Sequence, residues 1–361
     1  MNKIIFSVVV LVMIPFSGHS HHGTNGQFDA SKIIQVTGVI SDIAFVNPHA
    51  YVYIDVTNDD GETETWNCEL RAASVMKRSG WRKEMFANGI RVDIVGVAAR
   101  RDPLGCYVET ISFNGGEPIE RYAQIKENQI TPDSTRPAVT KWGAPNFAGD
   151  WAATQRLVGP ISGPNAMAPM GRRSGGRIEL TDSGTVALAR LTASEGDNVT
   201  GRLDCRPRDF FTDWIFDQHP NRVVQEEDKI VLNYGFMDTI RTIHIDLQEH
   251  PSDIEPSFGG HSIGKWDGDV LVVETIGFTE GASRRNVHSS SYRTVEKFSL
   301  QSENGKPVLM RSYQAYDPEY WTDGSILTGE QILYIADYPY EPYACDAVSY
   351  THLTLPTIYS V

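Results

Sequence analysis

Polar side chains on one predicted hairpin have the chemistry for proton transfer. The stretch 258–278 contains two alternating runs separated by Asp267-Gly268, a pair that predicts a tight type I′ turn. His261 lies on the first predicted strand and Glu274 on the second. A histidine beside a carboxylate can act as a general acid and base, and His244 on a nearby strand is a third candidate. The sequence therefore predicts His261, Glu274 and His244 as catalytic residues.

The same hairpin also has a structural interpretation. His261 would form a hydrogen bond beneath the turn, and Glu274 would pair with Lys265 or Arg241 across strands. In that case these polar groups stabilise the sheet and carry no chemistry.

Aromatic and basic residues in the second half predict a pocket for a small apolar or amphipathic molecule. Aromatic rings supply contact area, and a few polar groups fix the orientation of a ligand. The predicted ligand-binding residues are Trp151, Trp214, Arg241, Lys265, Trp266 and His288. The alternative is that these side chains make ordinary core and loop contacts.

Histidines near the start of the chain predict a metal site. Cleavage after Ser20 would leave a free amine on His21, which can chelate a metal together with its own imidazole. His22 and His49 can add imidazoles, a ligand set that suits Cu(II) and Zn(II). We expect copper or zinc at His21, His22 and His49. An incidental histidine pair is the alternative.

Residues 1–20 have the pattern of a Sec signal peptide. Lys3 precedes the apolar run Ile4–Ile14, which is too short to span a bilayer, and Gly18-His19-Ser20 places small residues before the cut. The sequence predicts a periplasmic or secreted product with no membrane insertion after cleavage.

The charge balance limits the partners. Formal net charge is −14, and clustered Lys and Arg, which phosphate neutralisation requires, are absent. We therefore expect a small-molecule ligand and no nucleic acid. The oligomeric state stays open.

Four cysteines are present, at positions 68, 106, 205 and 345, and none form a CxxC pair. In an oxidising compartment the pattern predicts two disulfides. Pairing within each half would give Cys68–Cys106 and Cys205–Cys345, but three connectivities are possible, and four buried thiols are the alternative.

The first unit, residues 21–116, reads as a small OB-like barrel. Its predicted strands are Val36–Ile43, Ala50–Thr57, Glu64–Leu70, Ile90–Ala98 and Tyr107–Phe113. A short helix over Ala72–Arg78, with Gly80 at its C-terminal end, completes the pattern.

The second unit, residues 147–346, reads as a larger antiparallel lipocalin-like barrel. It opens with a Gly-x-Trp motif at Gly149, and turns separate short strands at regular spacing, nine or ten in all. Residues 117–146 form a predicted linker with a short helix over Ile119–Glu127. Residues 347–361 read as a non-native tail. The fold class is all-β.

The first unit resembles a secreted bacterial domain family of unknown function. The resemblance rests on the histidine pair His21-His22 and on Asn47-Pro48-His49 before a long strand. It implies export and a fold, and no activity.

The second unit resembles an uncharacterised exported lipocalin-like, or calycin-like, family. The motif is Gly260-His261-Ser262-Ile263-Gly264-Lys265-Trp266-Asp267-Gly268-Asp269. The resemblance implies a barrel and no particular substrate.

Binding is the leading functional hypothesis: the larger barrel holds a small molecule, with a metal ion at the N-terminal histidines. One rival is an enzyme without a common motif, such as an isomerase, cyclase or hydratase that uses His261 and Glu274. Common hydrolase, kinase and metalloprotease chemistries have no support, because Gly-x-Ser-x-Gly, the P-loop, the dinucleotide fingerprint and His-Glu-x-x-His are absent. Another rival is an envelope structural or assembly protein.

Overall fold

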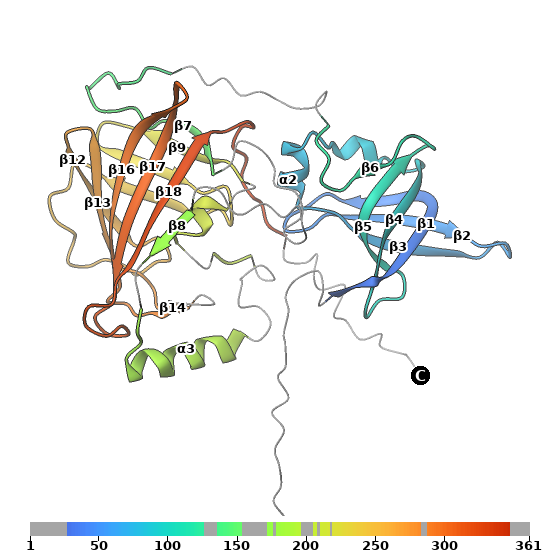
Figure 1. Ribbon diagram of the computed structural model, residues 1–361, viewed down its shortest axis with the longest axis horizontal. Helices are drawn as coiled ribbons and strands as arrows, with labels where there is room; N and C mark the ends of the chain where they lie inside the picture. Colours follow the sequence, from blue (N-terminus) through green and yellow to red (C-terminus); the bar gives the residue numbers. More distant parts are fainter. Residues whose placement is uncertain are drawn as a thin grey trace, which may run out of the picture.

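The computed structural model contains two large β-sheets connected along the chain (Figure 1). It describes residues 27–125, 136–153, 172–175, 178–195, 205–207, 210–216, 219–282 and 287–346, with backbone only for 172–175 and 194–195. The predicted mostly-β fold class is confirmed. Among the described residues, no helix combines the length and hydrophobicity that a membrane span needs.

The first sheet is a ring of strand pairings. Its strands are β1 (Phe28–Ala44), β2 (Tyr51–Thr57), β3 (Thr63–Glu69), β4 (Arg91–Ala99), β5 (Gly105–Phe113) and β6 (Ile119–Glu120). The order is β3-β2-β1-β4-β5-β6, and a parallel β3–β5 pairing closes the ring. That pairing covers only three residue pairs at one end of the strands, so the sheet does not form the closed barrel that the sequence predicts.

Short helices cover one side of this ring. Helix α2 (Ala73–Arg78) and the 3-10 helix η1 (Lys83–Phe86) lie between β3 and β4 in the chain. Met76, Trp81 and Phe86 from this segment are buried in the core of the sheet. Gly80 follows the C-cap of α2 with φ of 86°, as its predicted place at the helix end requires.

The second sheet closes into a nine-stranded barrel. Its strands are β7 (Gly149–Ala152), β9 (Asn221–Gln225), β10 (Lys229–Asn233), β11 (Ile240–His244), β12 (His261–Asp267), β13 (Val270–Ile276), β16 (Arg293–Glu303), β17 (Lys306–Tyr316) and β18 (Leu327–Ile335). Pairing of β17 with β18 closes the barrel, and β8 (Arg172–Gly175) adds to β18 as an outer strand. The barrel and its predicted strand number are confirmed.

One pairing in the barrel is parallel, so the barrel is mixed and not purely antiparallel as predicted. β11 and β12 run in the same direction, with Ile243 opposite Ser262 and His244 opposite Ile263. The connection 245–260 is long enough to carry the chain back to the starting end of β11. A short hairpin turn cannot do so.

The turn between β12 and β13 differs from the prediction by one residue. Asp267 pairs with Val270, so the loop is Gly268-Asp269, and of these only Gly268 has positive φ, at 59°. This matches a type II′ turn, in which glycine takes the first central position, and not the predicted type I′ turn. The hairpin between β16 and β17 does have two positive φ values, at Asn304 and Gly305.

One predicted element is wrong, and one helix was not predicted. Ile119–Glu120 forms strand β6 on β5, where the sequence suggests the start of a helix. The barrel domain also carries helix α3 (Asp182–Glu195), which the sequence analysis does not predict. The hydroxyl of Thr181 accepts a hydrogen bond from the Gly184 N–H, which is the side-chain cap that starts this helix.

Smaller elements complete the second unit. They are the 3-10 helix η5 (Asp213–Ile215) and a two-stranded sheet of β14 (Gly281–Ala282) and β15 (Val287–His288).

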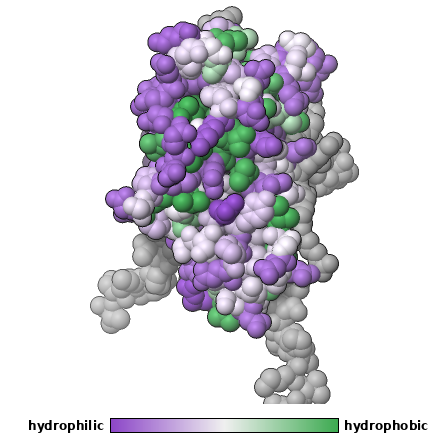
Figure 2. Space-filling view, turned by 90° about the vertical axis from the view of Figure 1, so that its left-hand side faces the viewer, coloured by the Kyte–Doolittle hydropathy of each residue, from purple (hydrophilic) through white to green (hydrophobic). Residues whose placement is uncertain are grey.

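On the side of the molecule shown in Figure 2, where β12 and β13 lie in Figure 1, apolar residues gather in the upper half among hydrophilic ones. Alternation places Leu271 and Val273 inward and leaves Val270, Val272 and Ile276 half-buried on the outer face.

Each of the two units contains one disulfide. Cys68 on β3 bonds Cys106 on β5 across the parallel pairing, and Cys205 bonds Cys345, 140 residues further on. The predicted pairing is confirmed, and the four-thiol alternative is wrong.

Two left-handed glycines provide a matched stability test. A Cβ at Gly80 would lie 2.1 Å from the backbone oxygen of Ile125, whereas a Cβ at Gly61 would meet nothing within 4 Å. We expect Gly61→Ala to cost about 1 kcal/mol, the left-handed penalty alone. Gly80→Ala should cost roughly 1–3 kcal/mol more, because it also overpacks the backbone. Urea unfolding checks this, and equal losses for the two variants would contradict the packing beneath Gly80.

Candidate functional site

A buried ion-pair triad lies inside the barrel. Arg241 on β11, Glu296 on β16 and Arg311 on β17 all have fully buried side chains. One carboxylate oxygen of Glu296 accepts a hydrogen bond from Arg241 Nη2. The other lies 2.6 Å from Arg311 Nε and 2.5 Å from Arg311 Nη2. We call these three side chains the lumen triad.

Polar neighbours on adjacent strands orient both guanidinium groups. Arg241 donates to the hydroxyls of Ser262 at 2.8 Å and Thr275 at 2.7 Å. Arg311 donates to Gln331 Oε1 at 3.1 Å. Acceptors on neighbouring strands of the barrel therefore fix the orientation of both guanidinium planes.

The triad has one more positive than negative charge. Burial alone would raise the pKa of Glu296, but the charges of Arg241 and Arg311 outweigh it and lower that pKa. Burial alone would lower the pKa of Arg241, but Glu296 outweighs it and raises that pKa. Glu296 is therefore charged at neutral pH, and guanidinium groups stay protonated in proteins.

Polar atoms inside the barrel lack partners. Among the described residues, Arg241 Nη1, Trp214 Nε1 and Thr294 Oγ1 are buried and form no hydrogen bond. The Tyr234 hydroxyl forms a hydrogen bond with the Arg241 side chain and donates to the Phe210 carbonyl at 3.4 Å. Leaving a buried donor unpaired costs about 1–3 kcal/mol, more for a charged group.

Aromatic side chains of segment 210–216 cover the triad. The Phe210 ring centroid lies 4.6 Å from the Arg241 guanidinium carbon and 5.3 Å from that of Arg311. Phe211 stacks on Tyr313 at 3.8 Å, and Trp214 packs in the barrel core. The lumen beside the arginines is thus filled by this segment.

The predicted ligand-binding residues separate into two groups. Trp151, Trp214 and Arg241 are buried inside the barrel, and Trp266 packs against the same core with its ring 5.3 Å from Phe147. Lys265 is exposed and donates to the Gln248 carbonyl, and His288 stacks on Tyr292 at 4.7 Å. The structure therefore brings three of the six together inside the lumen.

The predicted catalytic residues meet on the outer wall of the barrel. The His244 and His261 rings stack 5.0 Å apart, and His261 Nδ1 lies 2.9 Å from Nδ1 of His250 in the 245–260 connection. Glu274 faces the same side and interacts with His250. His250 is a member that the sequence analysis does not predict. Because these groups are outside the lumen, they cannot act on a molecule bound there.

Both imidazoles of the close pair favour the neutral form. Burial lowers the pKa of His250, and Glu274 only partly offsets this. Burial also lowers the pKa of His261, and the neighbouring His244 and His250 add to the effect.

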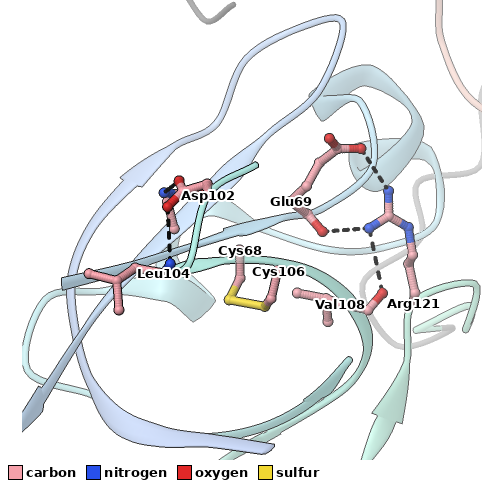
Figure 3. The surroundings of a disulfide bond; sticks show 8 residues. Cys68, Glu69, Asp102, Leu104, Cys106, Val108 and Arg121 are labelled. Atoms are coloured by element: carbon pink, nitrogen blue, oxygen red, sulfur yellow. Dashed lines mark hydrogen bonds and ion pairs between the residues drawn. A yellow bond between two sulfur atoms is a disulfide. The ribbon is translucent and has the colours of Figure 1, made fainter. Parts of the chain in front are cut away.

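In the first unit a buried carboxylate orients His49. Glu69 is buried, with Oε1 2.8 Å from His49 Nδ1 and Oε2 accepting from the Tyr51 hydroxyl at 3.2 Å. Arg121 also binds Glu69, through its backbone oxygen at 2.5 Å and its carboxylate at 3.7 Å (Figure 3). A histidine that donates to a carboxylate is typical of metal ligands.

The N-terminal metal site stays a prediction. His21 and His22 lie outside the described residues, and copper or zinc binding rests on them as much as on His49. In the part of the chain that the structure describes, no group of three or more His, Cys, Asp or Glu side chains is arranged to hold a metal ion.

A histidine also lies where the two sheets meet. Ser74 Oγ is 3.2 Å from His219 Nδ1 and donates to Asn47 Oδ1 at 3.0 Å. Since the hydroxyl proton of Ser74 points to Asn47, His219 must donate to Ser74 and cannot act as its base. This chain joins the sheets and does not form a nucleophile.

Residues 10–105 match a family of unknown function, DUF6152. The matched region includes the predicted His21-His22 pair and Asn47-Pro48-His49, so it confirms the resemblance of the first unit. A comparison with curated proteins found no match. The lipocalin-like resemblance of the second unit gains no support from these comparisons and stays a prediction.

Glu296 should be the residue on which the lumen triad depends. Glu296→Gln leaves two buried arginines without a counter-charge, and we expect a loss of about 3–5 kcal/mol in the free energy of unfolding. The matched control is Glu303→Gln at the exposed end of the same strand, which should cost little. Similar losses in urea unfolding for both variants would contradict the triad.

The histidine cluster should make stability depend on pH. The unfolded chain takes up protons near pH 6.5, and the folded pKa values of His250 and His261 lie below that. The unfolded state therefore binds more protons, and the free energy of unfolding should fall between pH 7 and pH 5. His250→Asn should make this decrease in the free energy of unfolding less steep. The neighbouring groups His244, Glu274 and Lys265 stay in place in this variant. His288→Asn, outside the cluster, should keep it. A His250→Asn profile as steep as that of the unmodified chain would refute the assignment.

Proposed function

We propose that this protein is exported and binds a small amphipathic molecule with one carboxylate group inside the barrel. The observation that carries the proposal is the uncompensated positive charge of the lumen triad. Arg241 Nη1 and Trp214 Nε1 are buried donors without partners in the same lumen.

The charge of the triad defines the polar end of the ligand. Burying an unpaired charge is costly, and a ligand with a single negative charge would neutralise the excess. A carboxylate suits a guanidinium because its two oxygens match the planar donors. We expect Arg241 to hold the carboxylate, with the Trp214 indole N–H as an additional donor.

The surrounding aromatic cluster defines the apolar end. Phe210, Phe211, Phe278, Tyr292, Tyr313 and Trp321 form one buried cluster next to the triad. Phe210 covers both guanidinium groups, so a ligand must displace this ring. Its carboxylate would replace a cation–π contact with a stronger ion pair.

The placement of His261, Glu274 and His244 favours binding over the enzymatic alternative. These residues share the outer wall and do not face the lumen triad. Signal-peptide cleavage after Ser20, export and the metal site at His21, His22 and His49 remain parts of the proposal.

Removing one hydrogen-bond donor from the lumen tests the proposed binding mode. Decanoate should bind the full chain in isothermal titration, and decanol, of the same length without charge, should bind far more weakly. Trp214→Phe should weaken decanoate binding about tenfold or more, because a hydrogen bond to a charged group is worth roughly 1.5–3 kcal/mol. The smaller ring should also lower thermal stability, because Trp214 is fully buried in the barrel core.

Trp81→Phe, the same replacement at a fully buried position in the core of the first sheet, should keep the affinity. Equal binding of decanoate and decanol, or no saturable binding of either, would rule out a carboxylate site at the lumen triad.

A further inference from the structure

A second buried cation lies in the first unit, outside the lumen. Arg71 follows β3 and is 6% exposed. Nη1 makes one long hydrogen bond, 3.4 Å, to Ser79 Oγ. Nη2 is buried and forms no hydrogen bond with any described residue. The guanidinium carbon lies 4.9 Å from the Tyr122 ring centroid.

The neighbours of Arg71 add positive charge. Burial is the largest cause that lowers the pKa of Arg71, to about 10, and the charges of Arg121 and Arg78 lower it further. Arg121 pairs with Glu69, and Arg78 lies 2.6 Å from Asp337. Among the described residues no carboxylate forms an ion pair with Arg71.

We infer that Arg71 is the binding site for a small oxyanion with a single negative charge. Three arginines and two carboxylates leave one positive charge without a partner, which one monoanion neutralises. Nη2 offers its unpaired N–H groups to the anion, and the Tyr122 ring lies beside the guanidinium. A carboxylate group is the simplest ligand of this class. The inference does not depend on the lumen triad, because no residue is shared.

An NMR titration that follows individual amide signals distinguishes binding at Arg71 from binding in the lumen. Sodium acetate is added to the isotope-labelled full chain at constant ionic strength, with chloride as the reference salt. We expect the amide signals of Ser79, Gly80 and Tyr122 to shift and saturate. Arg71→Met should weaken this response at least tenfold, and Arg91→Met, which removes an exposed arginine, should leave it intact.

The outcomes decide whether Arg71 binds an anion or has only a structural role. If acetate shifts none of these signals in the unmodified chain, or if Arg71→Met responds as the unmodified chain does, the site does not exist. A response to phosphate near pH 6 but not to acetate would overturn the carboxylate assignment and keep the oxyanion site. Should Arg71→Met fail to fold, the saturable shifts of the unmodified chain still decide the question.

Discussion

A single carboxylate, Glu296, neutralises one of two arginines that β11 and β17 direct into the barrel. It is fully buried and forms bonds to both of them. Because Ser262, Thr275 and Gln331 accept further hydrogen bonds from the two arginines, the triad links six strands around the closed sheet. Buried ion pairs are weak evidence for stability, but removing one partner is costly. The excess positive charge of the triad would favour an anionic ligand.

The two sheets are held together by the end of the chain. Arg78 on α2 binds Asp337, and Lys77 binds Glu341, both just after β18. Asn47 pairs with Cys345, which a disulfide joins to Cys205 in the barrel unit. Loops of the first sheet therefore contact the segment that closes the barrel, and His219 and Ser74 add a further contact.

The sequence predicted the features that local physics controls. Alternation located the strands of both sheets, and Asn304-Gly305 marked a hairpin. It could not give the parallel β11–β12 pairing, because the direction of return after a 16-residue connection is set by distant packing. Helix α3 was missed, although Thr181 before Asp182 is a capping signal.

The site was predictable only in part. Arg241 and Trp214 were identified from residue type, but their partners Glu296 and Arg311 were not. A signal existed, since Glu296 shares a strand face with Phe298, and Arg311 with Leu309 and Tyr313. A charge on an apolar face predicts burial, but which opposite charge it meets depends on how the barrel closes.

The presence of an acid in the lumen is the central claim. Native mass spectrometry of the full chain, purified without denaturation from the cells that produce it, tests the claim directly. The account predicts the polypeptide plus the mass of one small molecule, which organic extraction removes and which proves to carry an acidic group. A mass equal to the polypeptide alone, in fresh preparations and after incubation with the cell extract, would contradict it.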